Sequence, residues 1–110
     1  MNPSIFGVIH TDGFGDEDPP LESLVDLYDE LLSADAEHGD VTVSHDSSGW
    51  GISAHRDGRV VLGNIDDPQN VRHMIPVPKE RVIELWKKLI AGDINQVLSE
   101  PWKPGYGTLS

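Results

Sequence analysis

The chain has 110 residues, of which 37% are hydrophobic and 25% are charged, and this is the size and balance of a single globular domain over residues 1–110. It contains no cysteine, so disulfides, zinc–thiolate sites and catalytic thiols are excluded. The formal net charge of −11 disfavours binding to nucleic acid or to anionic lipid, because affinity for phosphate comes largely from Lys and Arg. No run is long enough to span a membrane and no secretory signal is evident, so we expect a soluble cytoplasmic protein.

The negative charge is concentrated in the first half of the chain. Residues 1–55 contain twelve Asp and Glu and no Lys or Arg, whereas residues 56–110 contain seven acidic and eight basic residues. A surface of one sign repels anionic partners and attracts cationic ones, so this segregation favours a cationic partner. The alternative is an acidic surface that only keeps the protein soluble.

The N-terminal part predicts a strand and then an acidic loop. Residues 4–9 form a short apolar run suited to a first strand, and residues 11–18 form a glycine-rich segment with several carboxylates. This segment lacks the ligand spacing of an EF-hand, so we expect a solvated loop and no metal site there.

An amphipathic helix is predicted next. Asp18 precedes two prolines and is suited to cap the helix, which begins near Leu21 and ends before Gly39. Apolar residues recur on one arc with helical period, and carboxylates occupy the opposite arc without a lysine at i+4. The carboxylates on this outer arc are Glu22, Asp26, Asp29 and Glu30.

The central part predicts a run of strands, over residues 41–45, 50–56, 59–63 and 71–77, with a loop over residues 64–70. Asp57-Gly58 is the signal for a two-residue type I′ hairpin turn. That turn pairs Ala54 with Val61 and places Val61 on the face that we expect to meet the helices.

The C-terminal part predicts two further helices, one from Pro78 to Gly92 and a short one from Asp93 that stops before Pro101. Residues 102–107 are expected to be irregular. The order of elements predicts an α+β domain, with an antiparallel sheet of about four to five strands and two main helices and a short third helix packed on one face.

No motif of catalysis or of cofactor binding is found. The five histidines form no H-x-x-x-H or H-x-H pair, and a metal site would need His45, His55 and His73 to lie on neighbouring strands with matching faces. His45, Asp46 and Ser47 have the residue types of a catalytic triad, but they are adjacent in a strand and turn, where successive side chains point in different directions. The G-x-S-x-G elbow of a hydrolase is also missing, so we do not expect a triad. We therefore expect no catalytic residue, no metal and no cofactor.

The three tryptophans differ in their surroundings. Trp50 and Trp86 lie on the apolar faces of their predicted elements and are expected in the core. Trp102 lies among prolines in the tail, where it either packs back on the sheet or provides an anchor for a partner. Packing on the sheet is the favoured interpretation, and Trp102 remains a candidate partner-binding residue.

Taken together, the acidic helix, the central hairpin and the late aromatic segments have a familiar layout. The hairpin contains Trp50-Gly51-Ile52-Ser53 and Arg59-Val60-Val61-Leu62, and the late segments are Glu84-Leu85-Trp86 and Glu100-Pro101-Trp102. The chain resembles the small immunity proteins that bacteria encode beside polymorphic or contact-dependent toxins. The resemblance covers most of the chain, but it is one of size, charge and layout. It implies a non-enzymatic protein that binds one cognate toxin domain, often a basic nuclease, and blocks its active site.

The first hypothesis is therefore a stoichiometric inhibitor with an acidic surface for a cationic partner. The alternative is a small ligand- or metal-binding regulatory domain, with a pocket between the sheet and the loops that carry His45, Asp46 and His73. A third possibility is a homo-oligomer that pairs along residues 71–77. The predicted partner-binding residues of the first hypothesis are Asp16, Glu17, Asp18, Glu22, Asp26, Asp29, Glu30 and Trp102.

Overall fold

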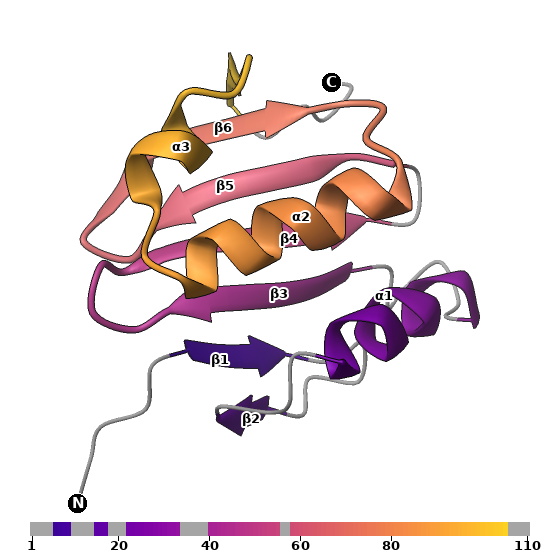
Figure 1. The fold of residues 1–110 in the computed structure, drawn as a ribbon. Coiled ribbons are helices and arrows are strands. Elements are labelled where there is room, and N and C mark those ends of the chain that lie inside the picture. The colour runs from indigo at the N-terminus through magenta and orange to yellow at the C-terminus, as the bar shows by residue number, and fades with distance from the viewer. Residues whose placement is uncertain (1–5, 10–14, 18–21, 34–39, 56–57, 106–110) are drawn as a thin grey trace, which may run out of the picture.

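Three helices cover one face of an antiparallel sheet in the computed structural model of the chain (Figure 1). The structure describes residues 6–9, 15–17, 22–33, 40–55 and 58–105. The predicted helix cap at Asp18 and the predicted helix end before Gly39 lie outside these residues. The α+β prediction, with the helices on one face of the sheet, is confirmed.

The sheet of the described residues has seven strands in the order β2-β1-β3-β4-β5-β6-β7, and each neighbouring pair is antiparallel. This exceeds the predicted four to five strands because a short strand is added at each edge. The strands are β1 (Phe6–Ile9), β2 (Gly15–Glu17), β3 (Asp40–His45), β4 (Trp50–His55), β5 (Val60–Asn64), β6 (Asp67–Met74) and β7 (Lys103–Pro104).

The two edge strands lie in segments that we predicted to be irregular. β2 falls within the acidic loop and pairs with β1, so that Gly15 lies opposite Ile9. β7 consists of two residues of the tail, opposite Arg72 and His73 of β6. Neither segment has the alternating apolar pattern of a strand, and backbone pairing with β1 and β6 places them in the sheet.

The start of β6 also differs from the prediction, which placed a loop over residues 64–70. A tight turn at residues 65–66 is closed by the Asn64 side chain, whose Oδ1 accepts a hydrogen bond of 2.8 Å from the backbone N–H of Asp66. The β5–β6 register shifts between Leu62 and Asn64, and Pro68 lies opposite this irregular stretch, where the ladder does not need its missing N–H. β6 ends at Met74, before Pro76, whereas the prediction extended this strand to residue 77.

The turn between β4 and β5 is one residue longer than predicted. The backbone N–H of His55 donates to the carbonyl of Arg59 over 2.8 Å, so this hydrogen-bonded pair encloses a turn of three residues instead of two. Gly58 closes the turn with φ of 91°, a conformation that glycine adopts without a steric penalty. The register is therefore shifted by one residue, and Ala54 pairs with Val60.

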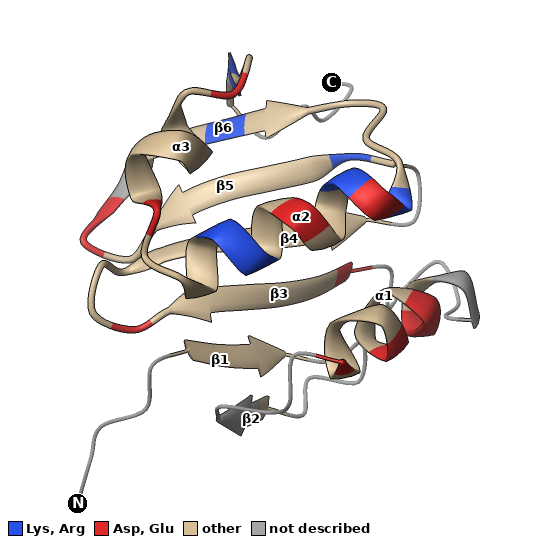
Figure 2. Cartoon of the chain, viewed as in Figure 1, with Lys and Arg blue, Asp and Glu red and all other residues tan. Residues whose placement is uncertain are grey.

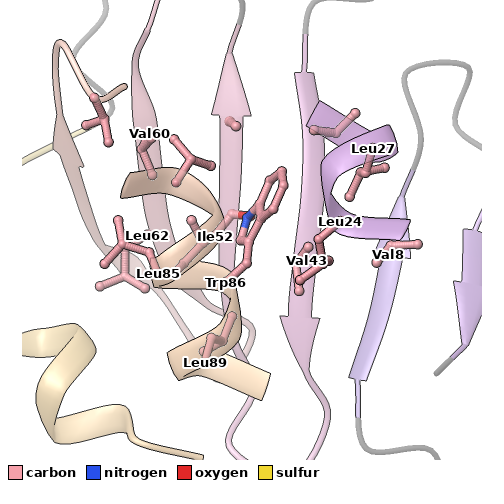
Figure 3. Packing of buried hydrophobic residues seen from close by; sticks show 14 of the residues in the cluster. Val8, Leu24, Leu27, Val43, Ile52, Val60, Leu62, Leu85, Trp86 and Leu89 are labelled. Carbon is pink, nitrogen blue, oxygen red and sulfur yellow. The ribbon is translucent and has the colours of Figure 1, made fainter. Parts of the chain in front are cut away.

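This shift changes which residues of β5 face the helices. Val60 and Leu62 are the residues that join Ile52 of β4 in the core (Figure 3). Val61 lies opposite Ser53 on the other face of the sheet, so the prediction that Val61 faces the helices is wrong. A one-residue slip has this effect because side chains alternate between the faces of a strand.

The helices are α1 (Ser23–Ser33), α2 (Lys79–Ile90) and α3 (Ile94–Leu98), close to their predicted positions. Pro78 is the N-cap of α2, and Gly92 follows its end with φ of 83°. Asp93 is the N-cap of α3, but its side chain makes no capping hydrogen bond. α1 and α2 contact each other, and both contact β3.

Trp86 of α2 occupies the centre of the core, as predicted from the helical pattern (Figure 3). It is fully buried, and its indole N–H donates a hydrogen bond of 3.0 Å to the carbonyl of Ile52. Tyr28 of α1 meets its ring edge-on, with centroids 6.4 Å apart and an interplanar angle of 63°. Trp50 is partly buried and packs against the same core. The indole therefore joins both long helices to the sheet.

Candidate functional site

The outer face of α1 carries the acidic surface that the sequence predicted. Leu24, Leu27 and Leu31 are buried against the sheet, which fixes the rotation of the helix. The opposite side then presents carboxylates, and Figure 2 shows acidic positions along α1, whereas α2 carries both basic and acidic ones. We call Glu22, Asp26, Asp29 and Glu30 the α1 acidic face; the first three are exposed and Glu30 is half-buried.

Repulsion between like charges on this face lowers the stability of the helix, because Glu22, Asp26 and Glu30 follow one another at i+4 spacing. Residues 22–33 contain no Lys or Arg that offsets them within the helix. Burial of the leucine side against the core stabilises the helix, and the dipole at its first turn favours Asp26. The sequence thus keeps the carboxylates together at some cost to helix stability.

One ion pair covers part of the α1 acidic face. Lys79 Nζ of α2 lies 2.6 Å from Asp29 Oδ1, and the two side chains are 36% and 49% exposed. Lys79 also lies 6.0 Å from the centroid of the Tyr28 ring. Glu22 and Asp26 form no ion pair with any residue that the structure describes. These two carboxylates are therefore the most accessible part of the face.

The pair between Lys79 and Asp29 is expected to add little to stability. Asp29→Asn should lower the free energy of unfolding by about 0.2–1 kcal/mol, since exposed ion pairs gain little in water. Urea denaturation of Asp29→Asn, Lys79→Gln and the double variant measures the coupling between the two side chains. A coupling above about 2 kcal/mol would contradict the weak coupling expected of a solvent-exposed pair.

The other predicted partner-binding residues do not extend this face within the described residues. Asp16 and Glu17 lie in β2, and their side chains are outside the described residues, as is Asp18. Trp102 lies just before β7, at the sheet edge opposite β2. Its indole N–H donates a hydrogen bond of 2.7 Å to the carbonyl of Val97, and the half-buried ring packs against the core. Trp102 therefore packs against the domain, as the sequence analysis favoured.

The three strand histidines do not come together. His45 of β3 is on the helix side of the sheet and pairs through Nδ1 with Ser48 Oγ at 2.8 Å. His73 of β6 is on the other side, where Nδ1 donates to the carbonyl of Gly105 over 3.0 Å. β4 and β5 separate the two, so the pocket proposed between them is not formed. No cluster of three or more His, Cys, Asp or Glu suited to a metal occurs in the described part of the chain.

Ser48 was not recognised in the sequence, although it is the hydroxyl that pairs with His45. Its Oγ also accepts a hydrogen bond of 3.3 Å from the backbone N–H of Trp50. These contacts order the turn between β3 and β4. The sequence signal for this contact is the spacing of three positions between His45 at the strand end and Ser48 in the turn, which is typical of local side-chain hydrogen bonds.

A hollow of about 350 Å³ lies between the end of β6, the start of α2 and the connection from α3 to β7. We call it the proline hollow, because three prolines from these separate segments line it. The sequence analysis missed it, since residues 74–81 and 100–103 come together only when α2 and α3 fold onto the sheet. Its lining includes Ile75, Pro76, Pro78, Arg81, Pro101 and Lys103.

Beside the proline hollow, Arg81 is held by two glutamates. Its Nη1 lies 3.0 Å from Glu84 Oε1, and its Nη2 pairs with Glu100 Oε1. The Glu100 side chain is only 10% exposed. Lys88 approaches Glu84 to 3.2 Å, and its hydrogen bond, with the charge of Arg81, holds the pKa of Glu84 below its usual value. The guanidinium is thus fixed in position at the wall of the hollow.

None of the described helices is long and apolar enough to cross a membrane. The comparisons with known proteins give no relative: no protein-family model, no curated protein and no solved structure matches this chain.

Proposed function

We propose that this chain is a non-enzymatic, acidic protein-binding domain that inhibits a cationic protein. In this proposal it is a cytoplasmic immunity protein, and the partner is a toxin domain such as a basic nuclease. The α1 acidic face is the surface that meets the partner. The immunity role rests on the resemblance in size, charge and layout described above.

The observation that carries the proposal is the accessible pair of carboxylates on Glu22 and Asp26. Both are exposed, neither forms an ion pair with a described residue, and no basic residue occurs on their helix. A cluster of one sign accelerates association with a partner of opposite charge by long-range attraction. The exposed carboxylates therefore support a cationic partner.

An apolar contact accompanies the charges. Val25 lies on the same side of α1 and is 41% exposed, although most large apolar residues of the helix are buried. Electrostatic attraction mainly raises the association rate, whereas a tight complex also needs apolar surface that becomes buried. Val25 supplies a small patch of such surface at the border of the carboxylates.

The test is the association rate with a protein captured from the native lysate at low salt and released at high salt. Replacing both of these carboxylates, in Glu22→Lys/Asp26→Lys, should slow association by about ten-fold or more at low ionic strength and flatten its salt dependence. We use Glu22 and Asp26 because reversal of Asp29 would also break its pair with Lys79. Stopped-flow fluorescence gives the rate constants.

The matched control is Asp66→Lys/Asp93→Lys, which changes the net charge equally at two exposed positions away from α1. This control should slow association much less than the α1 variant. Equal slowing by both variants would mean that only net charge matters and that α1 is not the binding surface. Unchanged kinetics in the α1 variant would refute the proposal for this helix.

A second candidate function, a small ligand-binding regulatory domain, is favoured by the proline hollow. Its volume of about 350 Å³ lies in the lower range of ligand pockets. The histidine pocket first suggested for that function is not formed, so the hollow replaces it as the candidate site.

A further inference from the structure

We propose that the proline hollow binds a small monocarboxylate, with an apolar body against its walls and its carboxylate at Arg81 and Lys103. The site shares no lining residue with α1, and it goes beyond the protein-binding function proposed above. The hollow is lined by residues from β6, α2 and the α3–β7 connection. Its apolar walls and its basic side chains indicate the chemistry of the ligand.

The walls of the hollow are apolar and preformed. Pro76, Pro78 and Pro101 have no backbone N–H, so they present carbon surface without an unsatisfied donor. Ile75 extends this surface and is 47% exposed. A ligand with an aliphatic or aromatic body would remove this apolar surface from water. The rigid rings limit the entropy lost on binding.

The charge of the hollow is opposite to that of the chain. Its lining contains two basic residues, Arg81 and Lys103, and one acidic residue, Glu100, in a protein of net charge −11. Glu100 is nearly buried and pairs with Arg81. Lys103 is exposed and forms no ion pair with any described residue. Glu84, which also pairs with Arg81, is offset by Lys88 at 3.2 Å, so one positive charge remains in this group of side chains.

Arg81 adds directed donors to this charge. A guanidinium has five N–H groups in a fixed fork, and the two glutamates hold it in place through Nη1 and Nη2. The donors that these bonds leave can meet a carboxylate, which is the anion whose planar geometry matches the fork. A phosphate dianion fits less well, because Glu84 and Glu100 repel a second negative charge. The arrangement thus selects a monoanion with an apolar body.

The test is a titration followed by ¹H–¹⁵N correlation spectra, with 3-phenylpropanoate and its uncharged amide, 3-phenylpropanamide, as probes. Both probes should shift the amide signals of Ile75, Val77 and Lys103, which surround the hollow. The carboxylate should bind roughly five-fold more tightly than the amide, because it adds an ion pair of about 1 kcal/mol. The spectra also report whether each variant is folded.

Two variants test the role of the charge. Lys103→Gln should lower the preference for the carboxylate to the part that Arg81 supplies and leave amide binding unchanged. The control Lys87→Gln removes an equal charge from the exposed side of α2, outside the hollow, and should preserve the preference. Ile75→Glu, which places a negative charge on the apolar wall, should abolish binding of the carboxylate.

Three results would overturn the proposal. They are the absence of shifts around the hollow up to about 10 mM of either probe, equal affinity for both probes, and an unchanged preference in Lys103→Gln. No partner protein takes part in this experiment. Its failure would therefore leave the function proposed for α1 standing, and failure of the α1 charge reversal would leave this site standing.

Discussion

Replacing Trp86 by alanine should lower the free energy of unfolding by about 3–5 kcal/mol, the largest effect that we expect from a single substitution. The indole is fully buried, and its removal leaves a cavity between both long helices and the sheet. The hydrogen bond to the carbonyl of Ile52 and the edge-on contact with Tyr28 are lost as well. Urea denaturation followed by circular dichroism measures the loss. Since domains are stable by only about 5–15 kcal/mol, this variant should be close to unfolding.

Trp86→Phe is the matched control, because it keeps an aromatic ring and removes the indole N–H. This variant should lower the free energy of unfolding by about 1–3 kcal/mol in total, for the smaller ring and the missing hydrogen bond. That loss is smaller than the one expected for the alanine variant. A loss below about 1 kcal/mol for Trp86→Ala would contradict the central position of this side chain in the core.

Leu24→Ala should lower the free energy of unfolding by about 2–5 kcal/mol, the second largest effect. Leu24 is fully buried on the inner side of α1, where it fixes the helix to the core. α1 has no basic residue to offset its carboxylates, so its stability depends on this packing. Hydrogen exchange of the α1 amides should therefore accelerate in the variant, and denaturation gives the global loss.

The control for Leu24 is its neighbour Val25, which is 41% exposed on the outer side of the same helix. Val25→Ala should change the free energy of unfolding by less than about 0.5 kcal/mol. Similar losses in the two variants would mean that α1 does not pack as the structure shows. Under the function proposed here, Val25→Ala should weaken the complex with the partner while the fold is unchanged.

Periodicity predicted the elements with long-range amphipathic patterns. α2 was expected between Pro78 and Gly92 and lies at Lys79–Ile90, because its apolar arc and both terminal signals agree. The same pattern correctly placed Trp86 in the core. Such patterns reflect burial of one face, which is why they survive in the sequence.

Turn geometry and short edge strands could not be predicted in the same way. Asp57-Gly58 suggested a two-residue turn, but Gly58 closes a three-residue one and shifts the register, so that Val61 faces away from the helices. Strand β2 pairs with the nearby β1 and strand β7 with the more distant β6, and in both cases the segment has no alternating side-chain pattern that would reveal it. The order of the strands is likewise a tertiary property.

The candidate sites show the same division. The carboxylates on the outer arc of α1 follow from helical spacing, whereas the pairing of Asp29 with Lys79 joins residues fifty positions apart and leaves no local signal. The proline hollow depends on Pro76 and Pro101 being brought together by α2 and α3. Sequence spacing alone cannot report such a contact.

The most direct test of the acidic binding surface is hydrogen–deuterium exchange of this protein alone and in complex with the cationic protein captured from its lysate. We expect the complex to slow exchange in residues 22–33, with the strongest effect in the half of α1 that carries Asp26. Exchange in the α3–β7 connection, which lines the proline hollow, should be unchanged. Slower exchange at that connection or elsewhere in the sheet, with α1 unaffected, would contradict the account.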